Sequence, residues 1–325
     1  MMEWTDRHCR AFHRLLAPNA RLYTEMVTTA ALQHGPRERL LEFAPAEHPI
    51  ALQLGGADPL ALADCARMGA IRGYDEINLN LGCPSDRVQE ARIGACLMKE
   101  PAHAADCVRA MVESVSVPVT VKCRLGVDDH DHYDVLATLV DLASRAGART
   151  FIVHARKAWL SGLTPAQNRS IPPLDYARVY RLKADFPELD IVLNGGIASR
   201  DAIVVHADAL DGVMLGRAAY HDPWLLASAE QALFGTAMPP SRRQVVDALA
   251  PHIERHLEGA GRLHDVTRHL LGLASGLPGA RRFRRHLSEH AHRPGAHLDV
   301  LYQALAWIDE SDPSHTSAAN DVRTA

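Results

Sequence analysis

Polar residues stand at the ends of several short apolar runs in this 325-residue chain, where their side chains could take part in chemistry. Lys122 ends one such run, and its side chain should face a pocket because a buried ammonium without a partner is costly. There it could act as a Schiff-base nucleophile or as a fixed positive charge beside an anionic cofactor ring. The side-chain amides of Gln53 and Asn80 each offer hydrogen-bond donors and an acceptor to a planar ring. Taken alone, either residue could instead be a buried amide whose hydrogen bonds are all made within the protein core. Their convergence with Lys122 and His154 favours a binding site.

Cys83 lies in a Gly-Cys-Pro turn directly after another apolar run, so its thiol should stand at the mouth of the pocket. A cysteine thiol is mainly protonated at neutral pH and can therefore donate a proton as a general acid. The six cysteines include no C-x-x-C pair and no zinc-like spacing, which predicts free thiols and no metal site. His130 and His132 on an acidic stretch could suggest a metal, but we interpret that stretch as a solvated loop.

Glycines follow the last two apolar runs, as Asn194-Gly195-Gly196 and as Gly216-Arg217. In a TIM barrel, glycine backbone after the last two strands, together with an arginine, is the usual phosphate cradle. These residues therefore predict a phosphorylated ligand. A tight left-handed turn with no ligand is the alternative explanation for the Gly-Gly pair.

The elements that must position these residues alternate regularly between residues 21 and 216. Apolar runs separated by amphipathic stretches indicate repeated βα units and a parallel sheet covered by helices. Seven such runs favour a TIM barrel, and no G-x-G-x-x-G follows the first run, which counts against a Rossmann domain. Residues 1–20 do not supply an eighth strand, so either the barrel lacks its first strand or the native start lies upstream. The predicted strands are residues 21–27, 50–54, 76–81, 117–123, 150–153, 191–193 and 212–215, and the predicted helices between them are 59–68, 101–115, 134–146 and 174–186.

The barrel domain is predicted to comprise residues 1–234. The residues that follow, 235–241, are typical of a linker. Residues 242–309 show helical periodicity without a strand signal, with helices expected at 242–257, 263–273, 280–290 and 298–307. The polar residues 310–325 predict a disordered tail. Residues 240–300 carry 10 basic and 6 acidic side chains within a chain of net charge −4. Such a basic segment could bind a polyanion, although a solvated helix face is the simpler interpretation of charge alone.

Three longer stretches carry a resemblance to a known family. They are residues 4–10 (Trp-Thr-Asp-Arg-His-Cys-Arg), 78–85 (Asn-Leu-Asn-Leu-Gly-Cys-Pro-Ser), and 154–160 (His-Ala-Arg-Lys-Ala-Trp-Leu) with its continuation at 168–174 (Asn-Arg-Ser-Ile-Pro-Pro-Leu). Read together, they resemble the tRNA-dihydrouridine synthases, in particular those that act on uridines 20 and 20a, over residues 1 to about 308. The resemblance implies an FMN-binding TIM barrel, a C-terminal helical tRNA-binding domain, and NADPH as the electron source.

The resemblance also implies roles for individual residues. Cys83 matches the proton donor to uracil C5, and the uridine must leave the D-loop stack to reach it. Asn80 would hold the uracil edge, and residues 86–92, including Glu90, could close over the base, although a plain surface loop is the alternative. Further tRNA contacts are expected at Asn168, Arg169, Arg282 and Arg285. The expected FMN ligands are Met1, Met2, Gln53, Lys122, His154, Asn194, Gly195, Gly196, Gly216 and Arg217.

Family members usually place a strand and Ala-Pro before the residues that match Met1 and Met2, which predicts a native start upstream of this numbering. An apolar content of 47%, a charged content of 23% and no bilayer-length apolar run predict a cytoplasmic protein, which we expect to be monomeric and without membrane contact. Competing functions are an FMN barrel acting on a small molecule, such as a dihydroorotate dehydrogenase, a Schiff-base aldolase using Lys122, and a tRNA-binding protein without FMN.

Overall fold

A computed structural model of the chain describes residues 1–85, 89–239 and 241–309. These residues form two compact units. The barrel unit comprises residues 1–3, 21–197 and 205–216, and the helical unit comprises residues 4–20 and 198–204 together with 217–309 of the described chain. Each unit has its own core and is described by itself.

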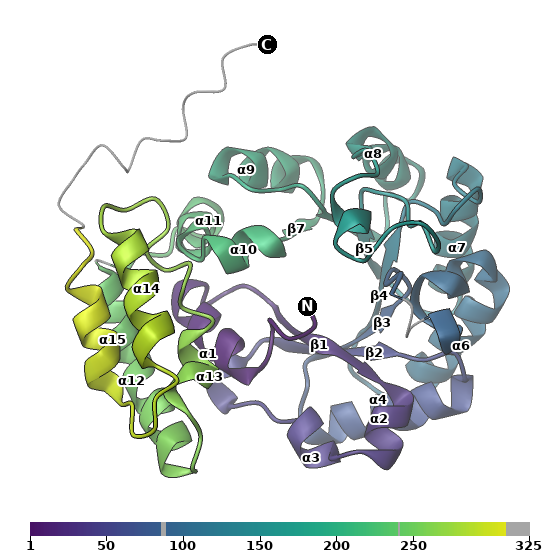
Figure 1. Ribbon diagram of the computed structural model, residues 1–325. Coiled ribbons are helices and arrows are strands. Elements are labelled where there is room, and N and C mark those ends of the chain that lie inside the picture. The colour runs from purple at the N-terminus through teal and green to yellow at the C-terminus, as the bar shows by residue number, and fades with distance from the viewer. Residues whose placement is uncertain (86–88, 240, 310–325) are drawn as a thin grey trace. The chain divides into compact units, whose positions relative to one another are not determined.

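The barrel unit is built on a parallel sheet whose strands follow one another in sequence order, so that β1 and β7 are its edges among the described residues. Figure 1 shows these strands curling around a common axis, with α4, α6, α7 and α8 outside them. Strands β2 and β3 are buried along their whole length, as expected for a sheet covered on both faces. The strands are β1 (Leu22–Thr28), β2 (Ile50–Gly55), β3 (Glu76–Asn80), β4 (Val119–Arg124), β5 (Thr150–His154), β6 (Asp190–Asn194) and β7 (Gly212–Met214).

Helices join consecutive strands of the barrel unit and begin where the sequence provides caps. The Asp58 carboxylate accepts a hydrogen bond from the Ala61 N–H, and Pro59 opens the first turn of α4. Asp175 caps α8 in the same way. The helices and short 3-10 turns are α2 (Thr29–His34), α3 (Arg37–Leu40), η1 (Pro45–Glu47), α4 (Pro59–Arg72), η2 (Gly94–Lys99), α6 (Pro101–Ser114), α7 (Tyr133–Arg145), η3 (Gln167–Arg169) and α8 (Tyr176–Asp185); α9 (Arg200–Ala209) has residues in both units.

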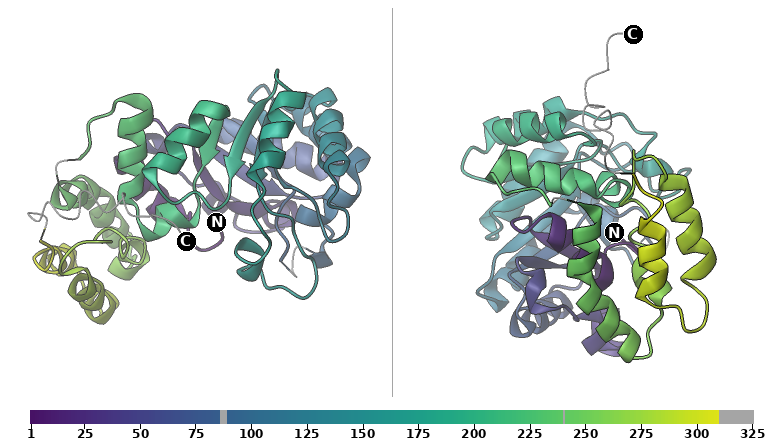
Figure 2. Two further views of the ribbon diagram at one scale, coloured as in Figure 1. Left: turned by 90° about the horizontal axis from the view of Figure 1, so that it is seen from above. Right: turned by 90° about the vertical axis from the view of Figure 1, so that its left-hand side faces the viewer.

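The helical unit encloses a second apolar core that joins the N-terminal helix to the C-terminal ones. Phe12 and Leu16 of α1 are buried in it together with Ile253, Phe283 and Leu301. Figures 1 and 2 both show α14 and α15 lying side by side. The helices are α1 (Arg7–Leu16), α10 (Arg217–His221), α11 (Trp224–Phe234), α12 (Arg242–Glu258), α13 (Leu263–Thr267), α14 (Ala280–His290) and α15 (Leu298–Leu305).

The predicted α/β class, the strands and the C-terminal helical region are confirmed, with element ends shifted by a few residues. The two compact units differ from the predicted division at residue 234, because α1, α10 and α11 pack with the C-terminal helices. The helix expected at 263–273 ends at Thr267, where turns replace it. The predicted tail at 310–325 lies outside the described residues.

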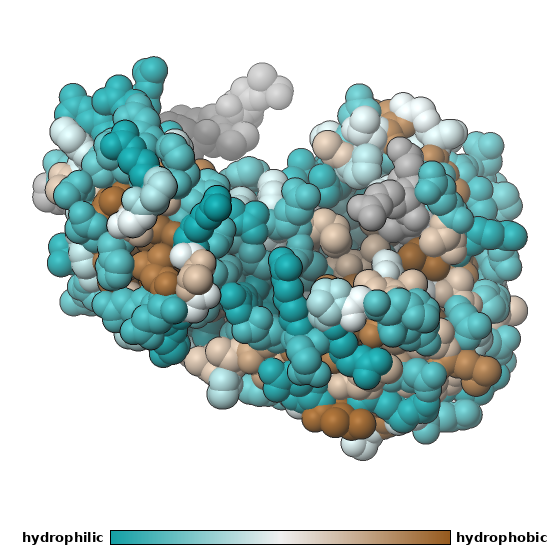
Figure 3. Space-filling view, turned by 60° about the horizontal axis from the view of Figure 1, so that its bottom comes forward, coloured by the Kyte–Doolittle hydropathy of each residue, from teal (hydrophilic) through white to brown (hydrophobic). Residues whose placement is uncertain are grey.

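The described surface is mostly hydrophilic in the view of Figure 3, where hydrophobic residues form separate small patches. Within residues 1–85, 89–239 and 241–309, no helix combines the length and apolar character that a membrane span needs.

Candidate active site

The carboxyl ends of the strands bring the polar residues of the sequence together at one edge of the barrel unit. Asn80 of β3 is paired with Lys122 of β4, and His154 of β5 is paired with Asn194 of β6. Since the strands are parallel and in register, these residues share one end of the sheet. This edge therefore gathers the residues expected there from the sequence.

A chain of amide hydrogen bonds links β2 and β3 to the turn that carries Cys83. The Gln53 amide donates from Nε2 to Asn78 Oδ1 (2.9 Å), and its Oε1 accepts from Asn80 Nδ2 (2.9 Å). Asn80 Oδ1 in turn accepts from the backbone N–H groups of Gly82 (3.0 Å) and Cys83 (2.9 Å). Asn80 therefore holds the Cys83 turn, which leaves one N–H of its amide for a ligand.

A buried polar layer below these amides supports them. Asn78 Nδ2 donates to Thr120 Oγ1 (2.8 Å), and the Thr120 hydroxyl donates to Glu76 Oε1 (2.6 Å). The Glu76 carboxylate also accepts from the Tyr23 hydroxyl (2.8 Å) and pairs with Arg21. Because a buried amide without partners is costly, this chain fixes the orientation of Asn78 and, through it, of Gln53.

Lys122 has a neutral hydrogen-bond partner. Its Nζ donates to Asn194 Oδ1 (3.1 Å), and Asn194 Nδ2 donates to the Met214 carbonyl (2.8 Å). Among the described residues, no carboxylate pairs with Lys122. Desolvation lowers the pKa of the Lys122 ammonium to about 8, and the nearby Arg124 charge acts in the same direction. A site with this lysine and no counter-charge suits an anionic ligand.

The glycines after β6 form a turn whose positive φ values favour glycine. Gly195 and Gly196 have φ values of +107° and +75°. A Cβ on Gly195 would stand 2.5 Å from His154 Cδ2, and one on Gly196 would stand 2.6 Å from the Tyr176 hydroxyl oxygen. The backbone is therefore bare and closely packed, and the Tyr176 hydroxyl anchors it by donating to the Gly195 carbonyl (2.8 Å). This cradle fits a phosphate.

The other predicted cofactor ligands lie at the chain start and after β7. Met1 is half-buried, and its Sδ would be 3.5 Å from a Cβ placed on Gly216. Met2 is largely exposed. Arg217 is the first residue of α10 and belongs to the helical unit.

Cys83 is a half-buried free thiol beyond the end of β3. Its Sγ lies 3.6 Å from Ser85 Oγ, and its carbonyl accepts from the Ala95 N–H (3.0 Å). Cys65, Cys107 and Cys123 are buried free thiols that pack in the interior. Within the described residues, His130 and His132 do not form a cluster of three or more potential metal ligands with other side chains.

The predicted tRNA contacts differ in accessibility. Asn168 is fully buried, and its amide bonds to the backbone of Trp159, Leu163 and Thr164 within its own loop. Asn168 therefore shapes this loop and does not offer its amide to RNA in this structure. Arg169 beside it is half-buried. Glu90 is exposed, whereas residues 86–88 of the expected closing loop lie outside the described residues.

In the helical unit, Arg282 and Arg285 are both exposed on α14, as the three-residue spacing predicts. The Arg282 guanidinium lies 5.1 Å from the centre of the Trp307 ring, and Arg285 Nε is 3.9 Å from Glu289 Oε1. Both arginines are therefore accessible to a ligand.

Two features of the edge were not predicted from the sequence. Arg124, two residues after Lys122 and on the same side of β4, is buried against the Cys83 turn. Tyr176 anchors the glycine cradle from α8. Because side chains alternate between the two faces of a strand, the position of Arg124 two residues after Lys122 could have indicated that it faces the same side. No local sequence signal identifies Tyr176.

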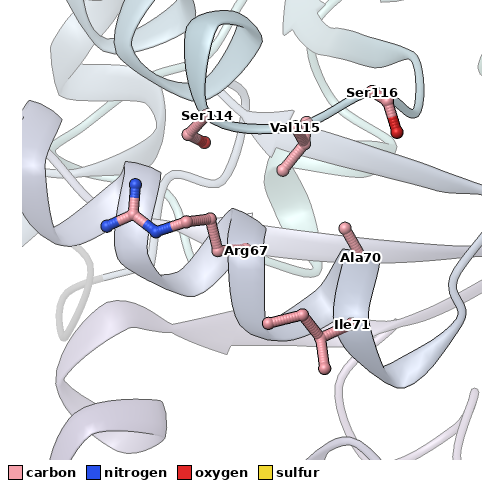
Figure 4. Close-up of a pocket in the computed structure, with 6 residues that line it drawn as sticks. All are labelled: Arg67, Ala70, Ile71, Ser114, Val115 and Ser116. Atoms are coloured by element: carbon pink, nitrogen blue, oxygen red, sulfur yellow. The ribbon is translucent and has the colours of Figure 1, made fainter.

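A shallow groove lies at the other end of the barrel unit. It is bounded by the last turns of α4 and α6, which lead into the starts of β3 and β4. Figure 4 shows the side chains that line it, which are Arg67, Ala70, Ile71, Ser114, Val115 and Ser116. Since it holds none of the strand-end residues, it is separate from the candidate active site.

Comparison with known proteins identifies the family to which the chain belongs. A family model described as dihydrouridine synthase (Dus) matches residues 1–306. A tRNA-dihydrouridine(20/20a) synthase of Vibrio vulnificus is 55% identical over 312 residues, which is 95% of each chain. Proteins of the same name from Xanthomonas campestris pv. campestris and Escherichia coli (strain K12) are 56% and 54% identical over 310 residues, covering 95% of this chain and 92% and 90% of theirs.

Proposed function

Because the chain belongs to the dihydrouridine synthase family, we propose that it reduces the C5=C6 bond of uridines 20 and 20a in the tRNA D-loop to 5,6-dihydrouridine. The observation that carries the proposal is the placement of Cys83. Its turn is held by Asn80 at the edge that also carries Lys122 and the glycine cradle. A thiol acid, a cation and an anion cradle at one edge suit a flavin-dependent reduction of a conjugated double bond.

We propose that FMN binds at this edge. The bare, closely packed backbone of Gly195 and Gly196 fits its phosphate, with Gly216 and Arg217 as the further phosphate ligands. The desolvated Lys122 ammonium, whose hydrogen-bond partner Asn194 is neutral, fits an anionic ring. The ring would lie among strand-end side chains and the N-terminal methionines; these ligands are Gln53, Lys122, His154, Asn194, Met1 and Met2.

Reduced FMN, when bound, supplies a hydride to uracil C6, with NADPH as the proposed source of the electrons. Cys83 holds the proton that is transferred to C5, and the thiolate left behind is reprotonated from solvent. Lys122 keeps a positive charge at the edge, which stabilises an anionic ring. The free N–H of Asn80 can hold the uracil edge while its oxygen keeps the Cys83 turn in place.

The tRNA is proposed to bind through shape and phosphate contacts. Arg169 would contact RNA beside the flipped uridine, and Glu90 lies on the loop proposed to cover it. Exposed Arg282 and Arg285 on α14 would contact phosphates elsewhere on the tRNA. A tRNA substrate is consistent with a cytoplasmic enzyme.

The proposal is tested with tRNA from cells that lack dihydrouridine. The purified chain is first examined by visible absorption, where we expect a flavin band. It is then incubated with NADPH and this tRNA, and nucleoside mass spectrometry should find dihydrouridine at positions 20 and 20a. A yellow protein that leaves both uridines unchanged, but turns over a small unsaturated substrate, would contradict the tRNA activity. A colourless protein trapped by borohydride on Lys122 with a carbonyl substrate would favour an aldolase.

A further inference from the structure

Arg124 is a buried side chain that the proposed reaction does not yet use. It is the last residue of β4 and is only 3% exposed. Its Nε donates to the Gly82 carbonyl (3.0 Å), and its Nη1 donates to the carbonyls of Lys157 (3.2 Å) and Asn168 (2.8 Å). One guanidinium therefore bridges the Cys83 turn and the loop that follows β5.

The Cys83 turn is held from two neighbouring strands. From β3, Asn80 accepts the N–H groups of Gly82 and Cys83. From β4, Arg124 binds the carbonyl of Gly82, the residue directly before Cys83. With both sides of this turn hydrogen-bonded, the peptide that carries the thiol has a defined position.

The loop after β5 is held by the same arginine. Arg124 bonds to the Asn168 carbonyl, while the buried Asn168 amide organises residues 159–164. Arg169, the proposed RNA contact, is the next residue. Arg124 therefore sets the spacing between the acid and the loop that would receive the RNA.

The chemistry of the contact requires arginine. Its planar fork can donate to carbonyls in different directions, whereas a lysine ammonium is a single point charge on a flexible stem. Within the described chain, no carboxylate pairs with Arg124. Burial lowers the pKa of its guanidinium to about 10, and the nearby Cys83 opposes this effect. Keeping an arginine here has a free-energy cost that a purely apolar packing residue would avoid.

We propose that Arg124 is a positioning residue, which locks the Cys83 turn to the loop of residues 157–168 so that the acid and the RNA-receiving loop keep one geometry. This inference rests on the proposed tRNA reduction, which gives Cys83 its role as acid. In this proposal Arg124 acts through Cys83, by holding the turn that carries the thiol.

Two substitutions test the proposal in the flavin-loaded protein. Arg124→Met removes the bridge and the charge. Arg124→Lys keeps the charge but has a single nitrogen in place of the separate Nε and Nη1 donors that reach the two loops. Arg37→Lys is the control, because it weakens another arginine contact with a backbone carbonyl, that of Leu32, in the segment between β1 and β2. Hydrogen–deuterium exchange should become faster in peptides covering 81–85 and 157–169 in both Arg124 variants, and should stay unchanged there in the control.

Kinetics then separate positioning from general destabilisation. Reduction of the bound flavin by NADPH does not require Cys83, so its rate should match that of the wild type. The kcat for tRNA reduction should fall at least about tenfold in both Arg124 variants, because small displacements of a catalytic group are costly. The KM for tRNA should change less than kcat, because the buried Arg124 is not itself one of the proposed RNA contacts.

Each outcome decides the proposal. Unchanged exchange at both peptides overturns the proposal. An unchanged kcat in Arg124→Lys also overturns it, because the charge alone would then suffice. If Arg124→Met does not fold, the exchange and kcat measurements on Arg124→Lys decide the proposal. If the wild type does not reduce tRNA, the proposed function fails, while the exchange experiment still shows whether Arg124 couples the two loops.

Discussion

The Lys122 ammonium lies 3.1 Å from the Asn194 amide oxygen. This hydrogen bond to a neutral group holds a positive charge at the carboxyl ends of the strands in the barrel unit. Asn194 is itself oriented by its bond to the Met214 carbonyl on the neighbouring strand. The contact keeps the ammonium in place without neutralising it. An anionic ligand at this edge would therefore meet a charge that the protein has already oriented.

Binding of FMN to the apoprotein should depend on pH through Lys122. The pKa of Lys122 is lowered to about 8, so the ammonium is charged at pH 7 and largely neutral at pH 9. The dissociation constant for FMN, measured by fluorescence quenching, should therefore rise about tenfold over this interval, which corresponds to about 1.4 kcal/mol.

Lys122→Arg should remove this pH dependence, because its guanidinium stays charged throughout. Lys122→Met should bind FMN weakly at both pH values. An equal rise in the dissociation constant for wild type and Lys122→Arg would show that another group is responsible.

Cys83→Ala should lower the rate of tRNA reduction by about 100-fold or more, the usual contribution of a positioned general acid. Flavin content and melting temperature should stay close to those of the wild type, because the thiol is half-buried and its contact with the Ser85 hydroxyl is long, at 3.6 Å. Cys96→Ala is the control, since Cys96 is also half-buried but lies on η2. Single-turnover assays with tRNA measure the effect, and an undiminished rate in Cys83→Ala would remove the acid role.

Tyr176→Phe should weaken FMN binding about fivefold, because it deletes the hydrogen bond that anchors the Gly195 carbonyl, worth about 1 kcal/mol. Tyr180→Phe is a matched control on the same helix, where the lost hydroxyl instead contacts His206 Nδ1 at 2.5 Å. Equilibrium titration of the apoproteins compares them. Equal affinities for Tyr176→Phe and wild type would mean that the cradle holds its shape without the tyrosine.

Much of the fold was predictable because its signals are local. The strand preceding Cys83 is a short apolar run, and the helix that follows Asp58 begins with a cap and a proline. The register of a parallel sheet then places Asn80 beside Lys122 without further information. Local pattern and parallel topology together account for the strand-end part of the site.

The remaining features depend on contacts between distant residues. Asn168 was expected to face RNA, yet it is buried, because several backbone groups of its own loop converge on its amide. Arg124 was not predicted as part of the site, because its three carbonyl partners come from two separate loops. The placement of α1 in the helical unit arises from Phe12 packing with residues more than two hundred positions later. Periodicity within one segment contains no information on such pairings.

Acid should destabilise the helical unit through buried histidines. Burial lowers the pKa of His13 to about 4 and that of His252 to about 4, against 6.5 when unfolded. Between pH 6.5 and 4 the unfolded chain therefore binds more protons, so the free energy of unfolding falls as the pH falls through this window. His13 alone contributes a loss of up to about 3 kcal/mol.

His13→Leu should therefore flatten this acid dependence while changing the free energy of unfolding much less at pH 7.5. Exposed His292→Gln is the control and should follow the wild-type curve. Urea unfolding at pH 4.5, 5.5, 6.5 and 7.5, followed by tryptophan fluorescence, measures the slope; Trp4, Trp224 and Trp307 all lie in the helical unit. Because His252 remains buried in the variant, part of the acid dependence should persist. A slope identical to that of the wild type would mean that His13 is protonated as easily in the folded chain as in the unfolded one.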